Sequence, residues 1–252
     1  MHPLIELEMA MKDLTTNERA WAKSWMLAAF ISMAFAAPAH AKQDATGVWA
    51  EDFGVANCKM TAAGRSAYFV LEPGYQQVLE KGPLRLQITV LDDTKVVDGV
   101  TTRVVEEREW DKGVLHEVSR NYYAMCEQTQ DVLHFGEDVE VYDVNGKFLK
   151  NDGTWLAGSN GHRPGLVIPG APKLGMKYYQ EIAPGVSLNR GEIVSLSQTC
   201  KTSAGTFTKC MKIKGTSGMD AKKLEYKYYA PNVGLVEGDG LRLVSYGPAK
   251  AK

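Results

Sequence analysis

The chain has 252 residues, of which 44% are hydrophobic and 23% charged, with 29 Lys and Arg against 30 Asp and Glu. This ordinary globular composition excludes a disordered polyelectrolyte, a collagen-like repeat and a multi-span membrane protein. The net charge of -1 also argues against binding nucleic acid through a global positive field, which needs clustered Lys and Arg.

The first 41 residues have the pattern of a secretory signal peptide. Residues 25–37 (WMLAAFISMAFAA) are apolar, follow Arg19 and Lys23, and precede the small residues Ala39 and Ala41. The apolar run is shorter than the ~20 residues that span a bilayer. We therefore expect a signal peptide over 1–41 with a long n-region, and a mature chain that is periplasmic or secreted and has no transmembrane anchor. An amphipathic N-terminal helix of the folded domain is the alternative.

The mature chain is expected to be all-β, as an antiparallel meander that forms a strongly curved sheet, half-barrel or barrel-like. Short runs rich in β-branched and aromatic residues recur between Gly, Asn and Asp, and no segment keeps a helical period. We expect a single domain over 42–252, with 42–156 and 176–252 as substructures joined by a glycine-rich loop at 157–175. The expected strands are 84–91, 101–110, 114–126, 131–135, 139–143, 147–150, 176–182, 192–200, 207–213, 224–230, 234–237 and 241–246.

Turn residues suggest how these strands pair. A two-residue loop at 112–113 would place Arg108 opposite Glu117 and Glu109 opposite His116, so that unlike groups face each other. Asn145-Gly146 is typical of a type I′ hairpin, because both central residues need a positive φ. Asp92-Asp93 is expected to end a strand, and residues 136–138 are expected to form a turn.

The four cysteines favour disulfides over metal or redox roles in an exported chain. A three-residue loop at 204–206 would put Cys200 directly opposite Cys210, at a distance that a disulfide can bridge. Cys58 is then left to pair with Cys126. Buried thiols are the alternative for either pair.

Common catalytic motifs are absent from the sequence: there is no G-x-S-x-G, H-E-x-x-H, P-loop or dinucleotide-binding glycine pattern. The densest polar set is His134, Glu137 and Asp138, which could bind a divalent cation or supply an acid and a base. A solvated acidic turn explains the same residues without a function. No other cofactor is indicated, and the catalytic residues of any reaction stay unknown.

Two further sets are candidates for ligand binding. Trp155, His162 and Arg163 lie in or beside the glycine-rich loop, where Arg163 could hold a carboxylate or phosphate. The second set, in which aromatic and polar side chains alternate on strands as they do in ligand pockets, is Tyr178, Gln180, Tyr226 and Tyr228. A structural connection and ordinary sheet packing are the respective alternatives.

Between about residues 100 and 236 the chain resembles an uncharacterised family of bacterial exported proteins and lipoproteins. The resemblance rests on TRVVEEREW (102–110), NYYAMCEQTQDVLHFGEDV (121–139), GTWLAGSNGHRPGLVIPGAP (153–172), YYQEIAPGV (178–186), SAGTF (203–207) and KYYAPNVGLV (227–236). It implies a mostly β, curved-sheet fold and no particular activity. The residues that it places in recurrent motifs are Glu137, Asp138, Trp155, Tyr179 and Glu181, whereas Cys200 departs from the pattern.

These observations predict an exported, soluble, non-catalytic binding protein for a small apolar or amphipathic ligand. The alternative is a metal-binding or metal-assisted hydrolytic enzyme that uses His134 or His162 with Glu137 and Asp138. A third hypothesis is an envelope protein that docks other proteins through an exposed strand edge. Nucleic acid is not an expected partner, and the sequence leaves the oligomeric state open.

Overall fold

The computed structural model describes residues 49–249, which form almost no regular structure other than β-strands. Fifteen strands make one antiparallel sheet, a small second sheet pairs β2 with β3, and Val55–Asn57 form a short 3-10 helix (η1). The expected all-β, curved-meander fold is confirmed, although the sheet is not a closed barrel. The strands are β1 (Met60–Thr61), β2 (Arg65–Ser66), β3 (Phe69–Val70), β4 (Tyr75–Lys81), β5 (Leu84–Val97), β6 (Val100–Asp111), β7 (Val114–Cys126), β8 (Val132–Tyr142), β9 (Phe148–Asn151), β10 (Trp155–Leu156), β11 (Gly165–Ile168), β12 (Lys177–Tyr179), β13 (Asn189–Thr202), β14 (Gly205–Ser217), β15 (Leu224–Ala230), β16 (Gly234–Gly238) and β17 (Leu241–Pro248).

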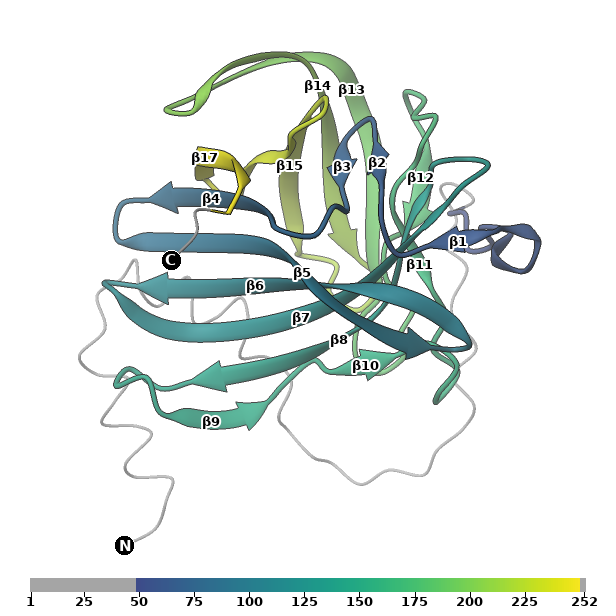
Figure 1. Ribbon diagram of the computed structural model, residues 1–252, viewed down its shortest axis with the longest axis horizontal. Coiled ribbons are helices and arrows are strands. Elements are labelled where there is room, and N and C mark those ends of the chain that lie inside the picture. The colour runs from purple at the N-terminus through teal and green to yellow at the C-terminus, as the bar shows by residue number, and fades with distance from the viewer. Residues whose placement is uncertain (1–48, 250–252) are drawn as a thin grey trace, which may run out of the picture. The chain divides into compact units, whose positions relative to one another are not determined.

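The large sheet consists of two meanders joined at one seam. Its strand order is β10-β8-β7-β6-β5-β4 and then β17-β16-β15-β14-β13-β12, so β4 and β17 form the seam. Figure 1 shows that β5–β8 run at a steep angle to β13–β15, and this turn gives the sheet its inner, concave side. The two ends of the strand order are linked by loop contacts, among them the bond from the Arg163 N–H to the Ile182 oxygen at 2.8 Å.

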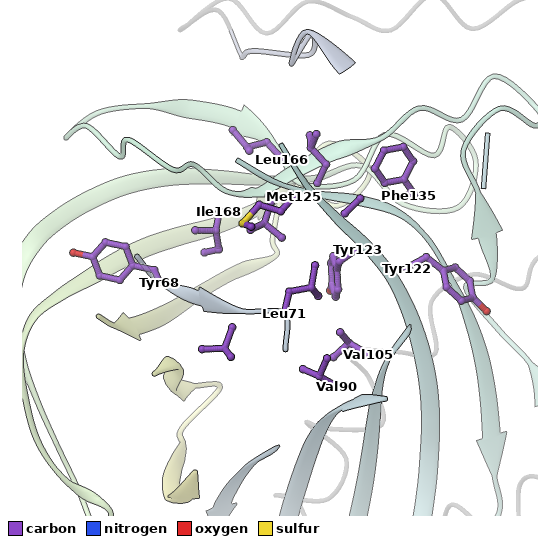
Figure 2. Packing of buried hydrophobic residues seen from close by; sticks show 14 of the residues in the cluster. Tyr68, Leu71, Val90, Val105, Tyr122, Tyr123, Met125, Phe135, Leu166 and Ile168 are labelled. Atoms are coloured by element: carbon purple, nitrogen blue, oxygen red, sulfur yellow. The ribbon is translucent and has the colours of Figure 1, made fainter. Parts of the chain in front are cut away.

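The hydrophobic core lies on the inner side of the sheet. Successive side chains of a strand point to opposite faces, so the neighbours Tyr122 and Tyr123 of β7 point in opposite directions (Figure 2). Residues 64–71, which include β2 and β3, pack against this inner side, and Leu71 is completely buried there among Val90, Val105 and Tyr123. This segment therefore fills the part of the concave side where the apolar residues of β5–β8 gather.

Bulges explain most differences between the expected and the observed strands. β5 continues through Asp92 and Asp93 to Val97, because the pairing with β6 shifts between Val90 and Thr94 and absorbs both aspartates. β8 is likewise one strand instead of two. Gly136 stays inside it at a φ of 138°, a conformation that suits glycine, so the expected turn at 136–138 does not form.

The expected loop at 157–175 contains a strand. β11 pairs antiparallel with the edge of β8, with Gly165 opposite His134 and Leu166 opposite Leu133. The hairpin at Asn145-Gly146 is present, but only Gly146 has a positive φ, so its turn is not type I′. Asp143 closes this turn instead, because its carboxylate accepts bonds from two backbone N–H groups.

The cysteines pair only in part as expected. Cys58 and Cys126 form a disulfide with Cα atoms 5.6 Å apart, which joins the segment before β1 to the end of β7. Cys200 and Cys210 are free, buried thiols. The expected register is wrong here, because a tighter turn and bulges in β13–β14 place Cys200 opposite Phe207 and Cys210 opposite Gln198.

The expected signal peptide at 1–41 lies outside the described residues. Within residues 49–249, no helix has the length and apolar character needed to cross a membrane.

Candidate functional site

Strand pairing gathers glutamates on the inner face of β6 and β7. Glu107 pairs with Ser119 and with Ile88 of β5, and Glu109 pairs with Glu117 and with Leu86 of β5. Paired residues point to the same side of a sheet. Because Leu86 and Ile88 belong to or pack against the hydrophobic core, these glutamates also face the concave side.

A bulge is responsible for the pairing of two like charges. The pairing of β6 with β7 shifts between Glu109 and Trp110, so Glu117 faces Glu109, and Arg108 faces Val118. The expected pairs of Arg108 with Glu117 and of Glu109 with His116 are therefore wrong by one residue. Directly opposed like charges destabilise a sheet, so this arrangement has no evident structural purpose.

A second bulge brings β8 into the same site. The pairing with β7 shifts between Asn121 and Tyr123, around Gly136, so His134 and Glu137 both face the inner side despite their odd spacing. Trp155 of β10 donates its indole N–H to Glu137 Oε1 at 3.2 Å. We call the four carboxylates of this face the inner acidic cluster: Glu107, Glu109, Glu117 and Glu137.

Glu181, in the connection between β12 and β13, borders the inner acidic cluster. Its Oε1 lies 3.7 Å from His134 Nδ1, and its Oε2 accepts bonds from Ser187 and Asn189. His134 is only 2% exposed, and burial lowers its pKa, so the ring is neutral near pH 7. It therefore contributes no positive charge to balance the carboxylates.

The opposite wall of the concave side is β15. Lys227, Tyr229 and Glu225 share its inner face, and Lys227 Nζ lies 3.3 Å from Glu225 Oε1. Glu225 and, across the interior, Glu107 are among the groups that raise the pKa of Lys227 above its ordinary value. Lys227 is thus a permanent cation that is paired mainly with its own strand neighbour.

The carboxyls of the inner acidic cluster hold their protons unusually strongly. Burial first, and then the nearby Glu117 and Glu107, raise the pKa of Glu109 to about 8. Burial and Glu107 raise the pKa of Glu117 to about 7, while burial and Glu181 raise that of Glu137 well above its usual range. Within residues 49–249 none of the four forms an ion pair. All four remain partly accessible to solvent.

One buried polar group of β12 lacks a partner. The Tyr178 hydroxyl belongs to a side chain that is 1% exposed, and it forms no hydrogen bond. Gly191 and Gly215 are paired, and neither has a side chain. The Tyr178 ring therefore lies over Gly191, and the Glu225 side chain lies over Gly215. Burial, and to a smaller extent the nearby Tyr229 of β15, raise the pKa of the Tyr178 hydroxyl.

The structure divides the residues that were predicted to bind a ligand. Trp155 borders the inner acidic cluster, whereas Tyr178 and Gln180 both lie over Gly191 of β13. Of the glycine-rich loop, His162 packs 6.1 Å from Trp155, whereas Arg163 pairs with Glu51 near the surface.

Tyr226 and Tyr228 do not join the inner site. They lie on the outer face of β15, where Lys212 Nζ is 4.1 Å and 5.2 Å from their ring centres. Alternation along the strand puts Lys227 and Tyr229 inside and these two tyrosines outside.

The predicted metal set does not converge either. Asp138 points to the outer face of β8, where it accepts bonds from Tyr122 and from Lys95 Nζ, whereas His134 and Glu137 point inward. In the part of the chain that the structure describes, no group of three or more His, Cys, Asp and Glu side chains is arranged to hold a metal ion.

A shallow depression of about 430 Å³ lies at the ends of the β4–β5 and β6–β7 hairpins. Arg85 and Trp110, which line it, are paired with each other and so share one face. The inner acidic cluster, not this depression, combines perturbed titratable groups with an inward-facing location.

Comparison with known proteins adds no relative, since no family model, no curated protein and no solved structure matches this chain. The resemblance to exported bacterial proteins therefore remains a prediction.

Sequence reasoning did not identify Glu107, Glu109, Glu117 or Lys227 as site residues. A signal was nevertheless present. The run Glu106-Glu107-Arg108-Glu109 puts charged residues on both faces of a strand in a protein whose sheet must bury one face. Charges at inward positions of a strand are a reason to suspect a binding site.

Proposed function

We propose that this protein is an exported, non-catalytic binding protein that holds a small amphipathic molecule against the concave side of its sheet. The observation that carries the proposal is the inner acidic cluster, in which four partly exposed carboxyls gather without an ion pair among the described residues. Collecting like charges in a poorly solvated place costs free energy in folding, and a bound molecule could recover that cost.

The surroundings of the cluster suit an amphipathic ligand. Leu86 and Ile88 flank the carboxyls on the same face, so apolar and polar groups alternate across a few strands. Binding sites for small molecules commonly combine such apolar walls with a few convergent polar groups. The disulfide between Cys58 and Cys126 favours an oxidising compartment, in keeping with export.

Native mass spectrometry of the protein purified from its own host tests this function. We expect a small molecule that stays bound under native conditions and is released on denaturation. Fluorescence titration with the neutral probe N-phenyl-1-naphthylamine should also saturate at one probe per chain. Absence of both a co-purifying molecule and saturable probe binding would refute the proposal.

A blocking variant locates the site. Gly238 pairs with Lys227, and a Cβ at Gly238 would lie 3.5 Å from Lys227 Cγ, an ordinary contact distance. Gly238→Leu should therefore fold, project beside Lys227 on the inner side and weaken probe binding about tenfold, a loss of ~1.4 kcal/mol. Tyr226→Leu, on the outer face of the neighbouring strand, is the matched control and should bind the probe as well as the unchanged protein.

A further inference from the structure

We infer that the outer face of the sheet carries a separate binding site, which takes a neutral saccharide. The site is the shallow depression of about 430 Å³ at the ends of the β4–β5 and β6–β7 hairpins. Its volume lies within the ~300–1,000 Å³ that is common for small-molecule sites. The inference is independent of the proposed function, because Trp110 of the depression follows Glu109 on β6 and therefore faces the other side of the sheet.

Strand pairing places an aromatic ring and an ion pair side by side in the depression. Glu80 pairs with Arg85, and Arg85 pairs with Trp110, so the three side chains form one row across β4, β5 and β6. Their strand neighbours Leu79 and Leu86 belong to the hydrophobic core, so the row faces outward. All three side chains line the depression, and Trp110 is half-buried there. The depression thus combines an apolar ring with charged groups beside it.

The ion pair favours a neutral, hydroxylated ligand. Arg85 Nη1 donates to Glu80 Oε1 at 2.6 Å, and both side chains are 42% exposed. The two charges compensate each other, so a charged ligand would be attracted by one group and repelled by its neighbour. Within residues 49–249 this bond leaves the other guanidinium N–H groups and Glu80 Oε2 without a partner. Neighbouring donors and acceptors of this kind match vicinal hydroxyl groups, each of which both donates and accepts.

The Trp110 ring suits the remaining part of a saccharide. One face of a pyranose ring presents mainly C–H groups, and an indole ring offers them a large apolar surface with a negative face. A sugar that stacks on Trp110 can direct its hydroxyl groups to Arg85 and Glu80, which lie in the same row. A purely apolar ligand would use the ring alone.

The walls of the depression are held by the backbone and left open by glycines. The Lys112 N–H donates to the Pro83 oxygen at 3.1 Å, which ties the β6–β7 turn to the β4–β5 turn. Gly82 and Gly113 line the depression, and a Cβ on either would meet no atom within 4 Å. A ligand therefore meets a preformed and unobstructed surface, which reduces the entropic cost of binding.

Ligand-observed saturation-transfer NMR with cellobiose, maltose and N,N′-diacetylchitobiose tests the inference. At least one of the three should bind saturably, with a Kd on the order of 1 mM. Absence of saturable binding by all three would overturn the inference and leave the proposed function intact. Glucuronate or glucosamine that bound more than tenfold more tightly than glucose would also overturn it, because a balanced ion pair gives no preference for charge.

Two variants locate the site. Trp110→Leu and Arg85→Met should each weaken saccharide binding about tenfold, and thermal unfolding shows whether each variant is folded. Arg242→Met is the matched control, because Arg242 extends the same row from the other side of Glu80 and pairs with Glu237 at 3.5 Å, outside the depression. It should bind the saccharide as well as the unchanged protein. Unchanged binding in either folded variant, or an equal loss in the control, would contradict the assignment.

Discussion

Charged side chains are arranged differently on the two faces of β6, β7 and β8. On the outer face, Arg120 lies 3.4 Å from Glu106 and 3.1 Å from Glu140, and Lys95 lies 3.0 Å from Asp138. On the inner face, within the described residues, the four carboxyls of the inner acidic cluster form no ion pair. The same strands thus carry ion-paired side chains on their outer face and unpaired carboxyls on their inner face.

This contrast separates charges that are paired from charges that are not. Ion pairs that solvent partly reaches, such as those outside, contribute little to stability. The inner carboxyls instead reduce stability, because they are poorly solvated and close to one another. A chain with 29 basic and 30 acidic residues could have paired them, and their segregation is the observation on which the proposed binding role rests.

The largest expected effect concerns the bulge that creates the inner arrangement. A Cβ on Gly136 would press on the backbone of Trp155 and lie 2.9 Å from Leu156 Cα, at a φ that favours glycine. Gly136→Ala should destabilise the protein by about 3–4 kcal/mol and disturb the inward position of Glu137. Chemical denaturation measures the loss. A stability equal to that of the unchanged protein would mean that the bulge does not constrain β8.

Removing the inner lysine should have the next largest effect. Lys227→Met deprives Glu225 of its ion-pair partner and increases the acidic excess, so we expect a loss of about 2–3 kcal/mol at pH 8. The loss should shrink at pH 5, where more of the surrounding carboxyls are protonated. Thermal unfolding at the two pH values checks this, and a loss that was the same at both would argue against an electrostatic origin.

Neutralising the opposed pair should stabilise the protein. Because the pKa of Glu109 is raised to about 8 and that of Glu117 to about 7, the unfolded chain ionises them first as pH rises, and stability falls between about pH 4.5 and 8. Glu109→Gln/Glu117→Gln should therefore gain on the order of 2 kcal/mol at pH 8 and almost nothing at pH 5. The groups around the pair that titrate or carry charge are Glu107, Asp152, Asp239 and Lys227.

The control for this gain is the same pair of pH values applied to Glu72→Gln/Glu127→Gln, which should show no such increase. A double variant of the inner pair that was less stable than the unchanged protein at pH 8 would show that the two carboxylates stabilise the sheet.

The smallest effect is expected on the outer face. Arg120→Met breaks the contacts with Glu106 and Glu140, both partly solvated, and should cost about 0.5–1 kcal/mol. Added salt should reduce this difference, because exposed ion pairs are screened. Urea unfolding at low and high salt measures it, and a cost as large as that of Lys227→Met would remove the contrast between the faces.

The strands could be predicted from the sequence, but their register could not. The bounds of β7 (Val114–Cys126) and β15 (Leu224–Ala230) match the expected ranges, since alternation and turn residues mark them clearly. The bulge beside Trp110 has no comparable sequence signal, and it alone decides whether Glu117 meets Arg108 or Glu109.

The candidate site was predictable only in part for the same reason. Glu137 and Trp155 could be singled out from composition and position, but Glu107 and Glu109 depend on which face each strand turns inward. A shift of one residue exchanges the two faces of a strand, so these residues become visible only once the pairing is known.

The ionisation of Glu109 and Glu117 is the most direct test of the account. Carbon NMR of protein labelled at the glutamate carboxyls, titrated from pH 4 to 9, should show two signals with pKa values near 8 and 7 that disappear from this range in Glu109→Gln/Glu117→Gln. Titration of every glutamate at ordinary pKa values would contradict the account, since the inner carboxyls would then be as well solvated as those on the surface.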